Sequence, residues 1–405
     1  MRILFVAMAN SIHTARWIGQ LSGQGWDVHL FPVEDMGVHT QLQGVKVHEF
    51  LTPPQSGLHP SVRVVGAWPF TRGSYLAKRI AGKLAPTRVE RTRRLARTIR
   101  DLRPDIVHSL EIQHAGYLTH GARAHFAEGE FPTWAVTNWG SDIFMFGRLA
   151  EHVERIKAVM EACDYYHCEC HRDVKLAREF GFKGEVLPVC PVAGGFDVER
   201  MRQLRQPGPT SGRRVVALKG YQNWAGRALV GLRALELCAD VLEGYTVAVH
   251  LPSPEVRLAA ELLGHATGIR FELERQGWTR DDVLRMHGRA RVSIGLSISD
   301  AISTSLLEAM IMGAFPVQSD TGCGDEWVRN GENGLLVHPE APEMVAAALR
   351  RALLDDALVD GAAEINARIA TERLERTLIE PQAIAMYKKM AASPRRRDKA
   401  AAAVS

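Results

Sequence analysis

The stretch RVSIGLSISDAISTSLLEAMIMGAFPVQS, residues 291–319, contains the features that decide the fold. RVSIGLS and FPVQS are short apolar runs, which are typical of buried strands. SLLEAMIM between them has the character of a helix and stops at Gly313, a residue type favoured just after helices. Two strands joined by a helix predict a parallel pair, because the helix carries the chain back to the starting edge of the sheet.

The same alternation of apolar runs and helical stretches recurs along the whole chain. Further apolar runs lie at residues 2–8, 27–33, 104–110, 133–138, 165–170, 184–189, 213–220, 245–251, 269–273 and 334–339. Strands that are apolar on both faces predict parallel sheets covered by helices on both sides. The predicted fold class is therefore α/β, with doubly wound sheets.

A chain of 405 residues is too long for one ordinary domain and fits two of similar size. A segment rich in Gly, Pro and Arg separates two halves that each begin with a strand. The predicted parts are a first domain at 1–192, a linker at 193–212, a second domain at 213–375, a helix at 376–393 and a flexible tail at 394–405.

Composition indicates a globular protein that works in a reducing compartment. The formal net charge is +4, which is too small to indicate nucleic-acid binding by itself. The six cysteines in so long a chain favour free thiols over a disulfide framework. We interpret the opening MRILFVAM as a buried strand, and no apolar run reaches the roughly 18 residues that span a bilayer. We therefore expect a cytoplasmic location, with any membrane contact peripheral at the inner face.

The loop SISDAIST and the helix after it have two interpretations. A helix N-terminus carries about +0.5 of an elementary charge and unpaired amides, so it suits a diphosphate next to the small residues Ser303 and Thr304. Glu308, about one turn further on, would then reach ribose hydroxyls. Alternatively, the pattern from Ser305 to Glu308 is an ordinary capping box.

The wider context resembles a known family. Asp300 and Glu308 stand eight positions apart and are followed by Ala-Met, Gly313, a Pro-containing strand and GCGDEWVRNGENGLLV at 322–337. This order resembles the donor half of retaining glycosyltransferases of the GT-B fold, especially glycosyltransferase family 4. The resemblance implies two Rossmann-like domains facing across a cleft, with the acceptor on the first and the nucleotide sugar on the second. The family usually has Glu where this chain has Asp300, and the glycines usual after it are absent.

The resemblance also implies roles in the second domain. The first acid, Asp300, would contact the transferred sugar, and Glu308 would contact the ribose. Lys219 and Arg227, in the loop that opens this domain, would hold the diphosphate as it leaves. The sequence contains no Asp-x-Asp pair, so we expect a metal-independent enzyme without a cofactor. Trp278 would either stack on the nucleobase or pack at a helix start.

In the first domain, the resemblance places Ser11, His13 and Asp142 on the acceptor side. A strand-end histidine of the family contacts the transferred sugar. Either His108 or His114 fits this position, and His114 is the preferred one.

The predicted function is transfer of a sugar from a UDP- or GDP-sugar to a saccharide or lipid-linked acceptor, in polysaccharide or glycoconjugate biosynthesis. Two rivals remain, a non-catalytic nucleotide-sugar-binding relative and a nucleotide-sugar epimerase. The arginine-rich helix at 87–103 has two interpretations as well. It is either a solvated helix face or a surface for an anionic membrane.

Overall fold

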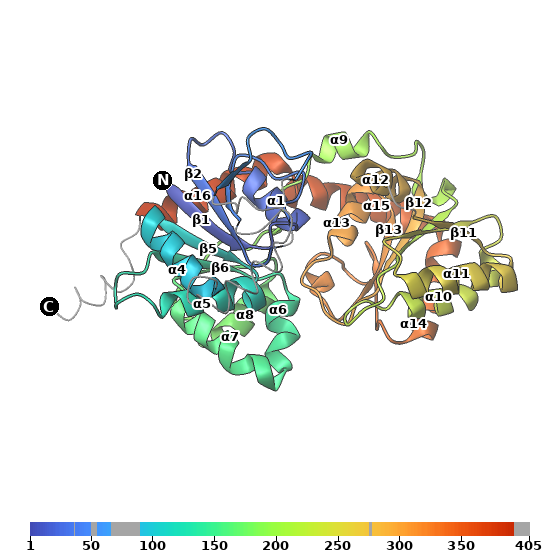
Figure 1. Ribbon diagram of the computed structural model, residues 1–405. Helices are drawn as coiled ribbons and strands as arrows, with labels where there is room; N and C mark the ends of the chain where they lie inside the picture. The colour runs from blue at the N-terminus through green and yellow to red at the C-terminus, as the bar shows by residue number, and fades with distance from the viewer. Residues whose placement is uncertain (36, 50–54, 66–89, 275–277, 393–405) are drawn as a thin grey trace. The chain divides into compact units, whose positions relative to one another are not determined.

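The structure is a computed structural model that describes residues 1–35, 37–49, 55–65, 90–274 and 278–392 (Figure 1). It divides into two compact units. The first contains Met1–Gly194 and the C-terminal residues from Ile379, and the second contains Gly195–Leu378. The segment 193–212, predicted as a linker, carries the short helix α9 (Val198–Arg202), and from Gly195 onward it belongs to the second unit.

The first unit is built on an eight-stranded sheet with the strand order β4-β3-β2-β1-β5-β6-β7-β8. Every neighbouring pair is parallel. The strands are β1 (Arg2–Ala7), β2 (Asp27–Pro32), β3 (Lys46–His48), β4 (Arg63–Val65), β5 (Ile106–Leu110), β6 (Thr133–Thr137), β7 (Tyr165–His167) and β8 (Glu185–Val186). The helices are α1 (Ile12–Gly19), α4 (Arg91–Leu102), α5 (Tyr117–Arg123), α6 (Ser141–Phe144), α7 (Ala150–Ala162), α8 (His171–Glu179) and α16 (Arg376–Ala392).

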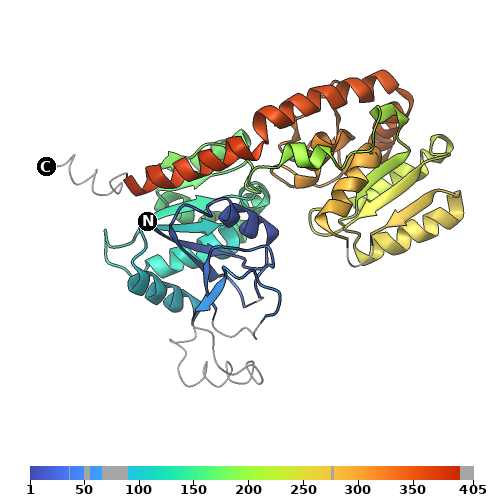
Figure 2. The same cartoon turned by 90° about the horizontal axis from the view of Figure 1, so that it is seen from above.

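Strand β1 shows why helices cover both faces of this sheet. Its side chains alternate, so Ile3 and Phe5 join one buried cluster while Leu4 and Val6 join another. Helices α1 and α16 supply the first cluster, and α4, α5, α7 and α8 supply the second (Figures 1 and 2). An all-apolar strand is stable here because each face has its own hydrophobic layer.

The second unit repeats this plan with a six-stranded parallel sheet in the order β11-β10-β9-β12-β13-β14. Its strands are β9 (Val215–Lys219), β10 (Thr246–His250), β11 (Arg270–Leu273), β12 (Ala290–Gly295), β13 (Phe315–Ser319) and β14 (Leu335–Val337). Its longer helices are α10 (Ala228–Glu236), α11 (Pro254–Thr267), α12 (Arg280–Arg289), α13 (Thr304–Met312), α14 (Pro342–Leu354) and α15 (Asp356–Arg373).

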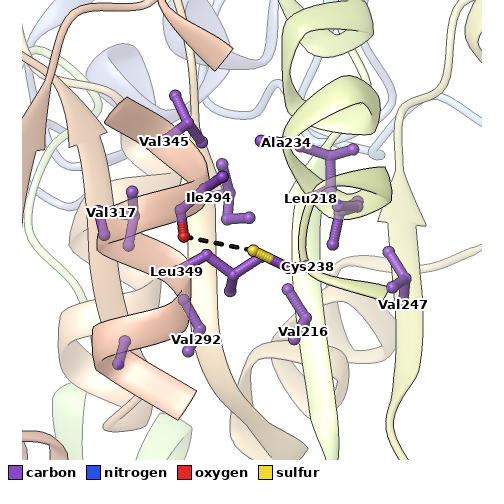
Figure 3. Close-up of a cluster of buried hydrophobic side chains, with 14 of the residues drawn as sticks. Val216, Leu218, Ala234, Cys238, Val247, Val292, Ile294, Val317, Val345 and Leu349 are labelled. Atoms are coloured by element: carbon purple, nitrogen blue, oxygen red, sulfur yellow. Dashed lines mark hydrogen bonds between the residues drawn. The ribbon is translucent and has the colours of Figure 1, made fainter. Parts of the chain in front are cut away.

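The main core of the second unit lies between its sheet and helices α10, α11 and α14 (Figure 3). Val216, Leu218 and Ile294 point from the central strands toward Leu349 of α14 (Figure 3). The thiol of Cys238 is buried here and donates to a backbone carbonyl at 3.3 Å. All six cysteines of the chain are buried free thiols, in agreement with the expected absence of a disulfide framework.

The predicted fold class is confirmed, since both units are parallel α/β sheets with helices on both faces. In each sheet the strand order reverses beside the first strand, between β1 and β5 and between β9 and β12. Doubly wound sheets bind ligands at the carboxyl ends of strands at such a switch point. The loops after β1, β5, β9 and β12 are therefore where a site is expected in each unit.

Helix α16 is anchored in the first unit by Tyr387, which is fully buried. The Tyr387 hydroxyl lies 2.7 Å from Trp17 Nε1 and 2.7 Å from His108 Nδ1. Since an indole N–H can only donate, Trp17 donates to Tyr387, and the Tyr387 O–H donates to His108. Helix α16 thus packs with α1 against the face of β1 that carries Ile3 and Phe5 (Figure 2).

The arginines of α4 divide into two groups. Arg93 and Arg97 are exposed, as either interpretation of this helix requires. Arg91 instead pairs with Asp35 at 2.8 Å, and Arg94 lies 5.6 Å from the centre of the Phe31 ring. Burial lowers the pKa of Arg94 to about 10. Among the described residues, no helix has the length and apolar character needed to span a bilayer.

Candidate active site

The first candidate site lies at the switch point of the second unit, where β9 and β12 end. Helix α13 begins at Thr304 after the extended residue Ser303, and it ends at Gly313, whose φ of 74° is left-handed. Lys219, the last residue of β9, places its Nζ 3.2 Å from Ser303 Oγ. A lysine ammonium thus lies beside a helix N-terminus, and both features favour a bound anion.

Glu308 is buried one turn inside α13, although carboxylates are seldom buried without a partner. Its Oε1 lies 3.7 Å from Nε of Arg280, the first residue of α12. The helix starts at Thr304, so Leu306 occupies the third helical position and Ser305 is not the cap. The capping-box interpretation of Ser305 and Glu308 is therefore wrong.

Asp300 lies in the loop before α13, and the loop after β13 holds it in place. Thr321 donates to the Ser297 carbonyl, and Cys323 N donates to the Ala301 carbonyl at 2.9 Å. A Cβ at Gly322 would come within 3.5 Å of Asp300 Cβ, so the two loops pack with little space between them. Asp300, which is predicted to contact the sugar, is thus a half-buried carboxylate on a braced loop.

Arg227, predicted as a second phosphate ligand, is held by Glu340 and by its own loop. Its Nε donates to Glu340 Oε1 at 3.0 Å, and its Nη1 donates to the Gly226 carbonyl at 3.0 Å. These contacts tie the guanidinium to its own loop and to the residues that follow β14. Lys219 and Ser303 are brought together by the structure, whereas Arg227 is held by Glu340.

Two aromatic residues near this loop differ in exposure. Trp278 is partly buried against a small apolar cluster that includes Ala217 of β9 and Ala309 of α13. This contact fits the interpretation of Trp278 as a packing residue. Tyr221 follows β9, is 39% exposed, and has its ring centre 4.9 Å from Lys219 Nζ. Burial, then the charges of Glu274 and Asp300, raise the pKa of Tyr221. The aromatic surface next to Lys219 is therefore Tyr221, which the sequence prediction did not include.

The second candidate site lies at the end of β5 in the first unit. His114 belongs to the π-helical turn Ile112–Gly116, and its Nδ1 lies 2.8 Å from Oε2 of Glu111. Glu111 has φ 86° and ψ 156°, a conformation that costs a non-glycine residue about 1–3 kcal/mol. Such strain often marks a functional position, because the surrounding structure has to enforce it.

His108 and His114 are in different environments. His108 is 1% exposed, and its Nε2 lies 2.7 Å from Thr137 Oγ1 while Tyr387 occupies Nδ1. Burial lowers the pKa of His108 well below its ordinary value, so the ring is neutral. The His114 side chain is 53% exposed. Of the two predicted histidines, it is His114 whose ring reaches the surface at the strand end.

The three residues predicted on the acceptor side lie after strands of the first sheet. Ser11 caps α1 by accepting from His13 N at 3.2 Å, and the His13 ring lies 5.5 Å from that of Trp139. Asp142 is buried and accepts from Ile112 N at 3.1 Å. Burial, then the nearby Glu111, raise the pKa of Asp142 well above its ordinary value. Asp142 thus braces the turn that carries His114.

Comparisons with known proteins identify the family and the fold of the chain. The family model described as "Glycosyl transferase 4-like" matches residues 2–67 and 69–167, and "Glycosyl transferases group 1" matches residues 258–369. One match lies in each unit. The chain therefore belongs to the group 1 and family 4-like glycosyltransferases. No curated protein matches it by sequence.

Solved structures show the same fold over nearly the whole chain. HepE from Anabaena, in complex with UDP and glucose, has a TM-score of 0.67 at 14% identity and covers 96% of this chain and 99% of its own. Sucrose-phosphate synthase from Thermosynechococcus elongatus has a TM-score of 0.67 at 16% identity, with 97% and 100% covered. The E. coli trehalose-6-phosphate structure with bound UDP-2-fluoro glucose has a TM-score of 0.64 at 12% identity, with 98% and 100% covered. These likenesses confirm the GT-B fold.

Proposed function

We propose that the protein is a retaining, metal-independent glycosyltransferase that moves a hexose from a nucleoside diphosphate to an acceptor hydroxyl. The observation that carries the proposal is the contact of Lys219 with Ser303 at the start of α13, at the switch point of the second sheet. This arrangement suits a diphosphate, since an ammonium and helix amides converge where nucleotides bind in such sheets. Two of the structural neighbours contain UDP, so UDP-glucose is the first donor to test.

The residues of the second unit have distinct roles in this proposal. Lys219 and the first amides of α13 bind the diphosphate and stabilise the charge that develops as it leaves. Glu308 accepts hydrogen bonds from the ribose, and Asp300 accepts them from the transferred sugar. Arg227 joins the phosphate ligands by exchanging Glu340 for the diphosphate, because Glu340 is its one charged partner among the described contacts and is half-exposed.

The bond changes of the proposed reaction balance without a further reactant. The bond between the sugar C1 and the phosphate oxygen breaks, and the acceptor oxygen bonds to C1 on the same face. The acceptor's proton goes to the departing phosphate, so no protein base is required. His114, Ser11, His13 and Asp142 supply the acceptor side in the first unit.

The acceptor is proposed to be a saccharide or a lipid-linked saccharide, in polysaccharide or glycolipid assembly. The exposed Arg93 and Arg97 on α4 support peripheral contact with an anionic membrane, and this contact remains a prediction. The residues 67–79, which also motivate it, lie outside the described part of the chain.

A turnover experiment tests the proposed reaction. The protein is incubated with UDP-glucose and a panel of sugar and lipid-linked acceptors in the presence of EDTA, and the product is examined by proton NMR. We expect a new glycoside with the anomeric configuration of the donor. Release of UDP only with an acceptor separates transfer from hydrolysis.

The same experiment distinguishes the rivals. An epimerase would change the sugar of UDP-glucose without any acceptor, and a non-catalytic relative would bind the nucleotide sugar without turnover. Inversion of the anomeric centre, or activity that EDTA abolishes, would contradict the proposed mechanism. A repeat of the assay with GDP-mannose and the same acceptors tests whether the enzyme uses a guanosine diphosphate donor in place of a uridine diphosphate donor.

A further inference from the structure

The contact between Glu111 and His114 differs from an ordinary surface ion pair in its burial and in the number of its hydrogen bonds. Glu111 is 5% exposed, and its carboxylate accepts from both the backbone N and the Nδ1 of His114. One carboxylate therefore fixes both the turn and the imidazole ring on it. The backbone of Glu111 is itself held, since its N donates to the Thr137 carbonyl at 2.8 Å and its carbonyl accepts from Gly116 N at 3.0 Å.

This arrangement determines which ring nitrogen a ligand can meet. With Nδ1–H donated to Glu111, the second nitrogen, Nε2, lies on the far side of the ring, and the side chain is 53% exposed. Asp142 supports the turn by accepting from Ile112 N at 3.1 Å. The imidazole is thus oriented before any substrate arrives, which is what a positioned hydrogen-bond donor requires.

We propose that Glu111 is a positioning residue that orients His114, so that Nε2–H donates to an oxygen of the transferred sugar or the acceptor. This inference rests on the proposed function and adds a residue to it that the sequence motifs do not contain. The strained backbone of Glu111 fits such a role, because a glycine would adopt its φ of 86° without strain. The chain retains a carboxylate there instead.

The charges around His114 support an imidazolium. The hydrogen bond that His114 donates to Glu111 raises the pKa of His114, burial opposes the rise, and the charges of Glu111 and Glu34 add to it. Glu111 caps the same turn, Glu34 follows β2, and Asp142 is the second residue of α6. Removal of the Glu111 charge should therefore lower the pKa of His114. The charge of Glu34 would still raise this pKa, by a smaller amount.

The test compares Glu111→Gln and Glu111→Gly with His114→Gln and the double variant Glu111→Gln/His114→Gln. We expect each Glu111 variant to lower kcat about tenfold, with little change in the Kd for UDP. The double variant should lose no more than His114→Gln alone, because both changes remove the same interaction. The alkaline limb of the pH profile and the NMR titration of His114 should shift to lower pH in Glu111→Gln.

Glu111→Gly guards against a simple folding defect, since it relieves backbone strain while removing the carboxylate. Glu154→Gln is the matched control, because Glu154 pairs with Lys157 at the same spacing on the exposed face of α7. Full activity in both Glu111 variants, or losses that add to that of His114→Gln, would overturn the inference. If the wild type binds UDP but transfers no sugar, the proposed function fails, and an unchanged His114 titration in Glu111→Gln would then refute the coupling separately.

Discussion

Substitution of Lys219 by Ala is expected to lower kcat/KM for the sugar donor on the order of 10- to 100-fold. A charge-assisted hydrogen bond to a phosphate contributes about 1.5–3 kcal/mol, and each 1.4 kcal/mol is about a factor of ten. The loss should fall on both binding and turnover, since the leaving diphosphate carries more charge in the transition state than in the ground state. Steady-state kinetics with UDP-glucose measures both parameters.

Two further variants make the Lys219 result specific. Lys219→Arg keeps the charge and should retain part of the activity, because a guanidinium reaches the phosphates with a different geometry. Lys157→Ala removes an exposed lysine from α7 of the first unit and should leave the kinetics unchanged. Equal activity of Lys219→Ala and Lys157→Ala would refute the role of Lys219.

Substitution of Tyr387 by Ala should lower the free energy of unfolding of the first unit by about 3–5 kcal/mol, the usual cost of removing a large buried aromatic side chain. Tyr387 is fully buried against Phe5 and Trp26, whose ring centres lie 6.0 and 5.9 Å away. Removing it also leaves Trp17 Nε1 and His108 Nδ1 without the hydroxyl that they share. Urea unfolding followed by tryptophan fluorescence measures the change.

The phenylalanine variant separates packing from hydrogen bonding. Tyr387→Phe keeps the ring and loses only the hydroxyl, so it should cost about 1–3 kcal/mol. Lys388→Ala changes an exposed neighbour on the same helix and should cost no more than about 0.5 kcal/mol. If Tyr387→Ala unfolded at the same urea concentration as Lys388→Ala, α16 would not be part of the first core.

Much of the fold could be predicted because buried parallel strands leave continuous apolar runs in the sequence. Strands β3 and β4 were missed because they lack such a run. Lys46–His48 buries only its central residue, and Arg63–Val65 is exposed throughout. Each strand has only three residues, and together they form one edge region of the eight-stranded sheet. The pairing of β2 with β3 and of β3 with β4 becomes visible only in three dimensions.

The site was less predictable because its decisive contacts join distant residues. The sequence could not separate His108 from His114, since the partner that buries His108 is Tyr387, 279 residues away. The Arg227 contact with Glu340 spans 113 residues and has no local signal. Glu111 was missed because nothing in a sequence shows that a non-glycine residue adopts a left-handed φ.

Glu308 provides the clearest test of the proposed nucleotide site, because the helix that carries it would also supply the amides for the diphosphate. Its carboxylate lies near Arg280 in the structure, and a ribose would give it two hydroxyl donors. Loss of such a charged hydrogen bond costs about 1.5–3 kcal/mol, so binding should weaken about tenfold or more. Glu343→Ala, an exposed acid in the first turn of α14, is the matched control.

The decisive measurement is a calorimetric titration of the wild type and Glu308→Ala with UDP, GDP and ADP, in buffer containing EDTA. We predict that one of the three nucleotides binds the wild type, that Glu308→Ala binds it at least about tenfold more weakly, and that Glu343→Ala binds it as the wild type does. If no nucleotide binds, or if Glu308→Ala binds as tightly as the wild type, the loop after β12 and helix α13 are not the donor site.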